Sequence, residues 1–484
     1  GEKFENTQNE MRQECIDNGI TDEAVINSFL DSPSRYKGIA YVPKEARWAT
    51  IMEKPGAKLN AALDDAIQEL ENSGDELKGC IRIGLFTSIN LDANVIKKIV
   101  DEVNKISHKT FGEEKDLIGR VYEYFLKSFA VNATKEEGEF YTPHDIVELI
   151  AAFIEPYDGT LYDPCCGSGG MFIQCAKYVE AKQGDIEKVN VYGQERDPAT
   201  YRLAKMNLAM RGISHHLGEQ NADTFSNDLH KGLTFDFIMA NPPFNLKKWY
   251  DISLSKDSRW ADYSVPPEGN ANYAWILHML SKLNAGKGVA GFLLANGALG
   301  DDDAIDIRQK LIENDKVEAV VVLPRELFYT TDISVTLWIL NENKKGGTWH
   351  DRKQRNREKE ILFMDLRQWT ENPVKKEQKK KIELKADQIK RATEIYFKWQ
   401  SEGTNGTNYA KPEQYRSVGL TELKEKNYSL VPSRYIEFVD RDSNINYHEV
   451  LTETATTVSD LLNRQERNDK TLRDALKQLG YECE

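Results

Sequence analysis

An apolar stretch at 235–240, typical of a β-strand, is followed directly by Asn241, Pro242, Pro243 and Phe244. An amino group on a heteroaromatic ring is a poor nucleophile, because its lone pair is delocalised into the ring. The side-chain carbonyl of Asn241 and a proline carbonyl could accept its N–H groups and favour a tetrahedral, nucleophilic nitrogen. Proline would keep the loop rigid, and Phe244 offers a face on which a planar substrate could stack. The motif predicts methyl transfer to an exocyclic amine without a metal or a covalent protein intermediate.

A glycine-rich loop at 163–170 lies between a strand pattern at 160–163 and a helical pattern at 171–180. Glycines permit positive φ and let the backbone approach a ligand closely, and the strand–loop–helix context is the one that such a loop needs. The spacing does not match the dinucleotide fingerprint G-x-G-x-x-G. The residues of this loop that we expect to contact a cofactor are Asp163, Cys166, Gly167 and Ser168.

Two acidic residues further along the chain could complete this pocket. Glu195 follows the strand pattern at 189–193, where a carboxylate can accept hydrogen bonds from both ribose hydroxyls of a nucleotide. Asp223 lies in the segment 221–224 and could accept the adenine amino group of the cofactor. A surface turn explains this second segment nearly as well.

A segment upstream of the glycine-rich loop consists of Glu139, Phe140, Tyr141, Thr142, Pro143 and His144. It is typical of a helix start, with Thr142 as N-cap and Pro143 at the first helical position. The same segment could face the methionine end of S-adenosylmethionine, and the two interpretations are compatible. We therefore expect these residues to contribute to the cofactor pocket.

The elements that must position these motifs alternate between strands and helices from about residue 145. Strand patterns lie at 160–163, 189–193, 235–240, 289–294, 317–323 and 334–340, with helical patterns at 146–154, 171–180, 199–210 and 273–283. This alternation predicts a doubly wound α/β sheet, in which ligands bind at the carboxyl ends of the strands. Residues 1–135 are mainly helical in pattern, including 22–26 and 59–70.

We expect four regions: an N-terminal helical domain at 1–135, a catalytic domain at 136–345, a basic, mixed peripheral region at 346–448 and a C-terminal helix at 449–484. Apolar residues at near-heptad spacing in 450–479 favour a packing helix or a coiled coil with a partner. Basic residues gather at 344–359 and 375–391. They form either a solvated surface or a contact with a DNA backbone.

The net charge of −14 is unusual for a protein that binds DNA alone, because phosphate neutralisation dominates such binding. Either a local basic face or a partner would have to hold the DNA.

The six cysteines show no metal-ligand spacing, so we expect reduced thiols and no metal. No membrane-spanning run or signal peptide is evident, which predicts a cytoplasmic protein. The sequence begins at Gly1 rather than Met, so we expect part of the natural N-terminus to precede it.

The order of these motifs resembles the gamma-class amino methyltransferases of DNA, and more narrowly the modification (methylase) subunit of type I restriction–modification systems. Residues 41–48 and 119–126 resemble the helical N-terminal domain of that family, and 328–333 resembles its late sheet region. The resemblance implies an S-adenosylmethionine-dependent, Rossmann-like fold and a cofactor pocket from 139–144, 166–168 and Glu195. It also implies methylation of adenine N6, with the base flipped out of the duplex and stacked on Phe244.

The same resemblance implies partners: double-stranded DNA, a specificity subunit that reads the sequence, a second copy of the methylase subunit and a restriction subunit in the full complex. A partner that holds the DNA would account for the acidic net charge. One alternative is a protein glutamine N-methyltransferase, which uses the same Asn-Pro-Pro chemistry, but the long helical N-terminal region argues against it. The other is a non-catalytic nucleic-acid-binding scaffold, against which the intact Asn241 and Glu195 argue.

Overall fold

The computed structural model describes residues 2–36, 41–73, 79–89, 92–105, 142–182, 184–328, 333–369, 382–402, 406–439 and 447–478. The sequence features at 119–126, 329–332 and 375–381 lie outside these residues, as do Glu139, Phe140 and Tyr141 of the expected pocket. The chain forms two compact units, Gly1–Ile436 and Glu437–Glu484.

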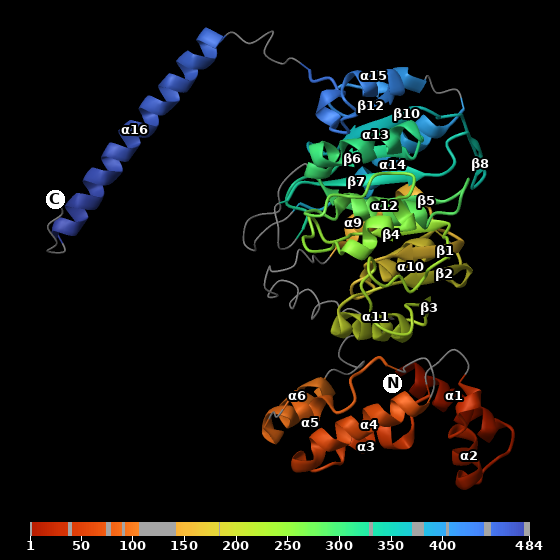
Figure 1. Ribbon diagram of the computed structural model, residues 1–484. Helices are drawn as coiled ribbons and strands as arrows, with labels where there is room; N and C mark the ends of the chain where they lie inside the picture. Colours follow the sequence, from red (N-terminus) through yellow and green to blue (C-terminus); the bar gives the residue numbers. More distant parts are fainter. Residues whose placement is uncertain are drawn as a thin grey trace. The chain divides into compact units, whose positions relative to one another are not determined.

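A ten-stranded sheet forms the centre of the first unit, in the order β11-β12-β10-β6-β7-β5-β4-β1-β2-β3 (Figure 1). The strands are β1 (Gly159–Asp163), β2 (Val189–Gly193), β3 (His215–His216), β4 (Phe237–Ala240), β5 (Val289–Ala295), β6 (Val317–Val322), β7 (Val335–Asn341), β10 (Glu360–Asp365), β11 (Ala410–Lys411) and β12 (Tyr415–Gly419). β1 to β5 run parallel, whereas β7 is antiparallel to both β5 and β6. The predicted α/β sheet is confirmed.

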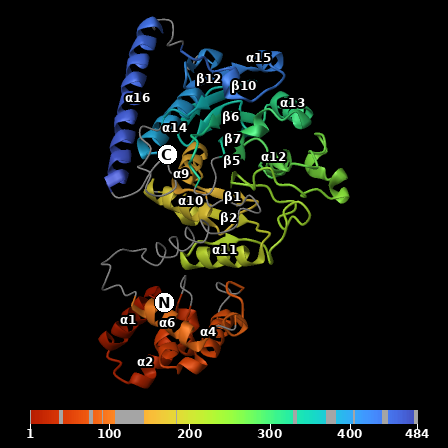
Figure 2. The ribbon, with the colours of Figure 1, turned by 90° about the vertical axis from the view of Figure 1, so that its left-hand side faces the viewer.

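Helices cover both faces of this sheet (Figure 2). One face carries α9 (His144–Ile154), α10 (Gly170–Ala181), α11 (Pro198–Met210) and α14 (Ala386–Gln400), and the other carries α12 (Asn272–Ser281), α13 (Ile305–Glu313) and α15 (Leu420–Glu425). In β4, Phe237 and Met239 join the first core, whereas Ile238 and Ala240 join the second. A strand buried on both faces is apolar throughout, which is why these strands are visible in the sequence.

The sheet continues past residue 345, where the sequence suggested that the catalytic domain ends. β10 pairs with β6 in parallel, β12 pairs with β10, and α14 packs in the same core as α9. The two short strands β8 (Gly347–Trp349) and β9 (Arg352–Gln354) form a separate hairpin. Residues after 345 therefore extend the central sheet.

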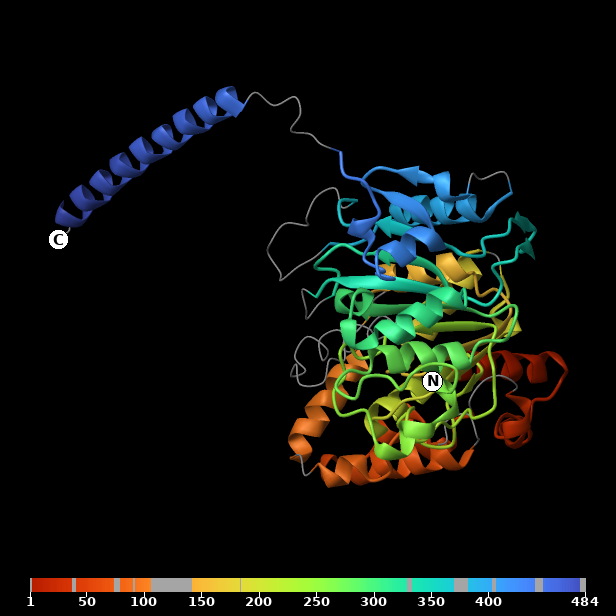
Figure 3. The ribbon, with the colours of Figure 1, turned by 45° about the horizontal axis from the view of Figure 1, so that its top comes forward.

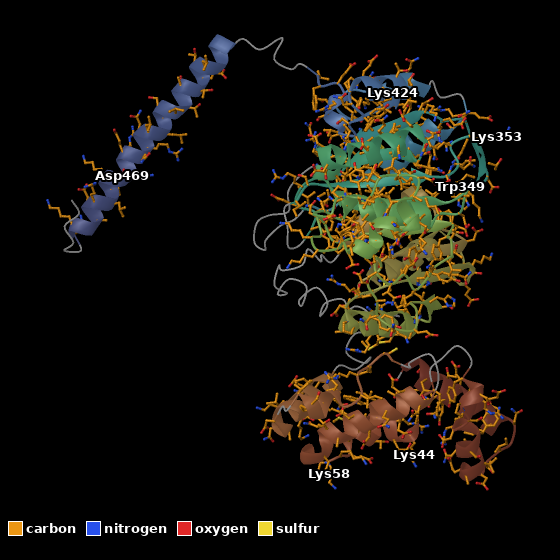
Figure 4. All side chains as sticks on the ribbon, in the orientation of Figure 1. Lys44, Lys58, Trp349, Lys353, Lys424 and Asp469 are labelled. Carbon is orange, nitrogen blue, oxygen red and sulfur yellow. The ribbon has the colours of Figure 1, made fainter. Side chains whose placement is uncertain are left out.

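Four basic residues of 344–359 form ion pairs within the fold: Lys344 with Asp315, Arg352 with Glu155, Arg355 with Glu360, and Arg357 with Glu318. The side chains of Lys344 and Arg357 are 2% and 0% exposed, so for these two a solvated surface is wrong. Buried charges are stable only when paired and hydrogen-bonded, as here. Lys353 remains exposed on the β8–β9 hairpin, where Figure 4 labels it.

The N-terminal helices have two small cores of their own, one between α1 and α2 and one among the helices from α3 to α6. They are α1 (Glu2–Asp17), α2 (Glu23–Leu30), α3 (Trp48–Met52), α4 (Leu59–Ser73), α5 (Leu85–Ser88) and α6 (Ala93–Lys105). Leu59, Ala66, Ile96 and Val100 pack together between α4 and α6. The helices predicted at 22–26 and 59–70 are confirmed.

The second unit contains one continuous helix, α16 (Tyr447–Gln478), at the position predicted for the C-terminal helix (Figure 3). Side chains project on every side of it, including that of Asp469 (Figure 4). Of the α16 side chains that the structure describes, these large apolar ones are exposed to 48% or more: Leu451, Val458, Leu461, Leu462 and Leu472. Among the described helices, α16 included, none has the length and apolar character to cross a membrane.

Candidate active site

The residues with predicted chemistry follow the carboxyl ends of three adjacent parallel strands. β1 pairs with β2 on one side and with β4 on the other, and all three run in the same direction. The loops that follow them are 164–169, 194–197 and 241–244. The chain therefore changes direction across the sheet between β1 and β4, and such a switch point is where open α/β sheets bind ligands.

The Asn241 side chain is held by Thr142. Its Nδ2 donates to Thr142 Oγ1 at 2.9 Å. Its Oδ1 is buried and has no hydrogen-bond partner among the described residues. A buried carbonyl without a donor costs free energy, so this oxygen is an acceptor that a ligand N–H would satisfy.

Thr142 does not act as the N-cap of α9, so this prediction was wrong. The helix begins at His144, its cap residue is Pro143, and no side chain caps it. The hydroxyl of Thr142 accepts from Asn241 instead of from a backbone N–H of the helix. The His144 side chain is 60% exposed and lies beside Glu148.

Phe244 packs inside the protein. The ring is 7% exposed and meets Phe328 edge-on, with ring centroids 6.0 Å apart. Pro242 is also buried, whereas Pro243 is partly exposed. Stacking of a substrate on Phe244 stays a prediction, and it requires the ring or its neighbours to move.

The residue after this motif is fixed by a pair of amides that sequence reasoning missed. Asn245 has a left-handed backbone with φ of 54°, a conformation that asparagine tolerates. Its N–H donates to Asn272 Oδ1 at 3.1 Å, and Asn272 Nδ2 donates to Asn245 Oδ1 at 2.9 Å. Asn272 is 1% exposed at the start of α12. The signal in the sequence was the position of Asn272, a polar residue directly before the apolar residues of α12.

The glycine-rich loop and Glu195 are in contact, as the cofactor-pocket prediction requires. Gly167 has φ of 56°, and its N–H donates to Glu195 Oε2 at 3.0 Å. The other carboxylate oxygen of Glu195 accepts from Asp197 N at 2.8 Å. A side chain at Gly167 would meet nothing within 4 Å, so the loop borders open space. Asn207 Nδ2 donates to Ser168 O at 2.7 Å and steadies the loop from α11.

The two adjacent cysteines of this loop are free thiols, with Cys166 buried and Cys165 half-buried. Burial and the neighbouring Asp163 and Glu195 raise the pKa of both Cys165 and Cys166 well above the ordinary value. A thiol that stays protonated is a poor nucleophile and a poor metal ligand. Cys166 N donates to Gln194 O at 2.9 Å, so this residue joins the ends of β1 and β2.

Asp163 is 2% exposed and accepts Cys165 N at 2.9 Å. Burial, together with the charge of Glu195, raises the pKa of Asp163 from 3.8 to about 7. Between these values the folded protein holds a proton that the unfolded chain has released. The free energy of unfolding therefore falls as pH rises through this window.

The Asp163→Asn variant is expected to lack this loss, because asparagine does not titrate and its Oδ1 can still accept Cys165 N. From pH 5 to pH 8, wild type should lose about 2–3 kcal/mol more unfolding free energy than the variant, since each tenfold change in proton affinity is about 1.4 kcal/mol. Urea denaturation at the two pH values measures this difference. Parallel losses in both proteins would contradict a raised pKa at Asp163.

Asp223 forms a turn, as the alternative interpretation of residues 221–224 predicted. One of its carboxylate oxygens is still available to accept a hydrogen bond. Oδ1 accepts Phe225 N, Ser226 N and Ser226 Oγ at 3.0, 3.0 and 3.1 Å. For Oδ2 the described part of the chain supplies no donor within hydrogen-bond reach. The turn therefore orients a carboxylate whose second oxygen can accept a ligand N–H.

Gln194, which sequence reasoning also missed, holds the segment that carries Asp223. It is 0% exposed. Its Nε2 donates to Ala222 O and Asn227 O at 3.2 and 2.8 Å, and its Oε1 accepts Leu229 N at 3.1 Å. The residue next to Glu195 thus fixes the following loop, which brings both expected acidic residues to one end of the sheet.

These features fit a nucleoside-containing sulfonium cofactor. The glycine-rich loop is open on one side, so a ligand can approach its backbone. The carboxylate of Glu195 at the end of the next strand suits a ribose, and the oriented carboxylate of Asp223 suits an adenine amino group. Among the described residues, no group of three or more His, Cys, Asp or Glu side chains is placed to hold a metal ion. The five described cysteines are free thiols.

Two family models match the chain. The N-6 DNA Methylase model matches residues 113–443, and the HsdM N-terminal domain model matches residues 2–103. Together these matches cover both the N-terminal helices and the sheet with its candidate active site.

Individual relatives and a solved structure agree with these models. The type I restriction enzyme HindI methylase subunit of Haemophilus influenzae is 34% identical over 91% of this chain and 100% of its own length. The MjaIX methylase subunit of Methanocaldococcus jannaschii is 32% identical over 92% of this chain and 78% of its own. The methyltransferase subunit of a type I restriction–modification system from Streptococcus thermophilus has the same fold, with a TM-score of 0.68, 22% identity and coverage of 87% and 86%.

Proposed function

The chain belongs to the N-6 DNA methylase family, among the methylase subunits of type I restriction enzymes, and we propose that it methylates adenine N6 in the pocket around Asn241. The single observation that carries this assignment is the buried Oδ1 of Asn241 at the carboxyl end of β4, for which the described part of the chain supplies no hydrogen-bond donor. Such an oxygen suits the N–H of a neutral amine. A fixed amide keeps this oxygen in place as an acceptor, and the hydrogen bond from Asn241 Nδ2 to Thr142 Oγ1 fixes the amide.

The protein's contribution to the reaction is positioning and hydrogen bonding. Asn241 Oδ1 accepts one N6–H, and the backbone carbonyl of Pro242 accepts the other. Both bonds hold the nitrogen and strengthen as its positive charge develops, so they favour the transition state. S-adenosylmethionine, when bound, supplies the electrophilic methyl group. The N6–methyl bond would form as the methyl–sulfur bond breaks, the electron pair of that bond would stay on sulfur in the released thioether, and the surplus N6 proton would leave to solvent.

The remaining pocket residues would hold the methyl donor. Glu195 would accept from the ribose hydroxyls, and Asp223 Oδ2 from the adenine amino group. The backbone of the 163–168 loop would line the donor through Asp163, Cys166, Gly167 and Ser168. Thr142, Pro143 and His144 would border its methionine end, and the Thr142 hydroxyl would connect this stretch to Asn241.

The target base must leave the duplex to reach Asn241, because its amino group is otherwise paired. Phe244 would stack on the flipped base after the edge contact with Phe328 opens. The net charge of −14 argues that another chain holds most of the DNA. We assign that role to a specificity subunit, in a cytoplasmic complex that contains a second methylase copy and accepts a restriction subunit.

The helix α16 is the candidate dock for the specificity subunit. Leu461, Leu462 and Leu472 are exposed, because a single helix has no core of its own in which to bury them. Apolar residues at near-heptad spacing are stabilised by packing against another helix. The surface of α16 therefore fits a helical partner.

Removing residues 447–484 is expected to abolish co-purification with the specificity subunit while leaving S-adenosylmethionine binding unchanged. The double variant Leu461→Glu, Leu472→Glu should weaken assembly at least about tenfold, because two apolar contacts are replaced by buried charges. Asp469→Asn on the same helix serves as the matched control. Size-exclusion chromatography measures assembly, and an unchanged complex after truncation would contradict this role.

The proposed function is tested by transfer of a labelled methyl group to duplex DNA, with and without the specificity subunit. We expect label in DNA only when both chains are present. Label in protein glutamine would favour the alternative methyltransferase. Donor binding without transfer under any partner condition would favour the non-catalytic scaffold.

A further inference from the structure

Residues 245–271 form a lobe between the catalytic loop and α12. Two tryptophans build its interior: Trp249 is 6% exposed, Trp260 is 2% exposed, and their rings are perpendicular with centroids 5.9 Å apart. Trp249 Nε1 donates to Pro267 O at 3.0 Å, and Ala271 N donates to Leu246 O at 3.0 Å. The two ends of the lobe are thus tied together. Aromatic packing and closed ends make the lobe a defined body rather than a loose loop.

This lobe rests on the turn that carries Asp223. Trp249 packs against Phe225, two residues after Asp223, with ring centroids 5.0 Å apart and planes at 60°. Phe225 also contacts Trp275 of α12 at 4.3 Å between centroids. The adenine side of the expected cofactor pocket and the continuation of the catalytic loop therefore share one aromatic cluster.

Arg259 joins the lobe to this turn with charge-assisted hydrogen bonds. Its Nη1 donates to Thr224 O at 2.9 Å, and its Nη2 donates to Phe225 O at 2.6 Å. Its Nε and Nη2 also donate to the Asp257 carboxylate at 2.9 and 2.7 Å. The side chain is 9% exposed. A planar guanidinium can serve two carbonyls and a carboxylate together, which a lysine cannot do.

Asp257 and His278 fix the orientation of Arg259. Burial alone would raise the pKa of Asp257, but its hydrogen bonds with Arg259 hold that pKa below the ordinary value. His278 is 0% exposed, and burial, with Arg259 nearby, holds its pKa well below the ordinary value. Since a guanidinium only donates, Nδ1 of His278 accepts from Arg259 at 3.2 Å. The ring proton is then on Nε2 and donates to Tyr162 Oη of β1 at 3.1 Å.

We infer that Arg259 is a positioning residue that couples the Asp223 turn to the lobe continuing the catalytic loop. This inference rests on the proposed assignment of Asp223 to the methyl donor. Donor binding would stabilise the turn, the turn would hold Arg259, and Arg259 would hold the lobe that begins at Asn245, directly after the catalytic loop. By linkage, the lobe would in return raise the affinity for the donor.

The test is a double-mutant cycle on S-adenosylmethionine affinity, measured by isothermal titration calorimetry with the full chain. Arg259→Lys is expected to raise Kd about tenfold, because the carbonyls lose charge-assisted donors. Asp223→Asn should raise Kd as well. Combined with Asp223→Asn, Arg259→Lys should add less than about twofold, because both act through one turn. In the assembled complex, KM for the donor should rise with Kd, while kcat at saturating donor falls less than about threefold.

Asp257→Asn is the second variant in case Arg259→Lys does not fold, and it should raise Kd about threefold by loosening the guanidinium. Arg434→Lys, at an exposed arginine, is the matched control. The coupling would be overturned if the increase in Kd of the double variant equalled the product of the two single increases. A wild-type Kd in Arg259→Lys would overturn it as well. A wild-type Kd in Asp223→Asn would instead overturn the assignment of Asp223 and leave the methyl-transfer function standing.

Discussion

Replacing Asn241 by alanine is expected to lower kcat by about 100- to 1,000-fold, the loss found when a preorganised transition-state hydrogen bond is removed. The variant loses the buried Oδ1 that lacks a partner among the described residues. Donor affinity should stay within about twofold, because the proposed donor contacts come from other loops. Rates of labelled methyl transfer by the assembled complex, with calorimetry for the donor, measure the two effects separately.

A matched pair at Thr142 tests whether the orientation of the Asn241 amide matters. Thr142→Ser keeps the hydroxyl that accepts from Asn241 Nδ2 and should retain most activity. Thr142→Val has nearly the same shape without that acceptor, and we expect kcat to fall about tenfold, as for one lost hydrogen bond. Equal activity of the serine and valine variants would show that this contact does not position Asn241. Methylation by Asn241→Ala at the wild-type rate would refute the mechanism.

Glu195→Gln is expected to raise Kd for S-adenosylmethionine about 100-fold, since hydrogen bonds to a charged group contribute about 1.5–3 kcal/mol each. The carboxylate already accepts Gly167 N and Asp197 N. A glutamine amide would place N–H groups against one of these backbone donors and would disturb the glycine-rich loop too. Calorimetry with the full chain measures the affinity.

Glu219→Gln, at an exposed position, is the control for the loss of one negative charge. It should bind the donor as wild type does. A 100-fold loss in Glu195→Gln must also appear as a higher KM with little change in kcat at saturating donor, because the role is binding. A Kd within about twofold of wild type would contradict the assignment of Glu195.

The sequence was informative where a strand is buried on both faces. The apolar runs at 235–240 and 289–294 correspond to β4 and β5, and the Asp197-Pro198 pair starts α11 as predicted. These features are local, because burial and capping leave their pattern in a few consecutive residues. The position of Asn241 at the end of β4 follows from them directly.

The contacts that shape the site could not be predicted, because they join side chains far apart in the chain. Arg259 contacts the carbonyls of residues 224 and 225, and Asn241 contacts Thr142. Nothing in the spacing distinguishes Arg259 from a solvated arginine. For the same reason, the pairing of β10 with β6 and the ion pair of Arg357 with Glu318 became visible only in the structure.

The identity of the methylated nucleoside is the most direct test of adenine N6 methylation at Asn241. DNA treated with the assembled complex and S-adenosylmethionine is digested and analysed by liquid chromatography and mass spectrometry, beside DNA treated with the Asn241→Ala complex. We expect N6-methyldeoxyadenosine from wild type and none above background from the variant. Methyl groups on cytosine, or equal N6-methyladenine from both proteins, would contradict it.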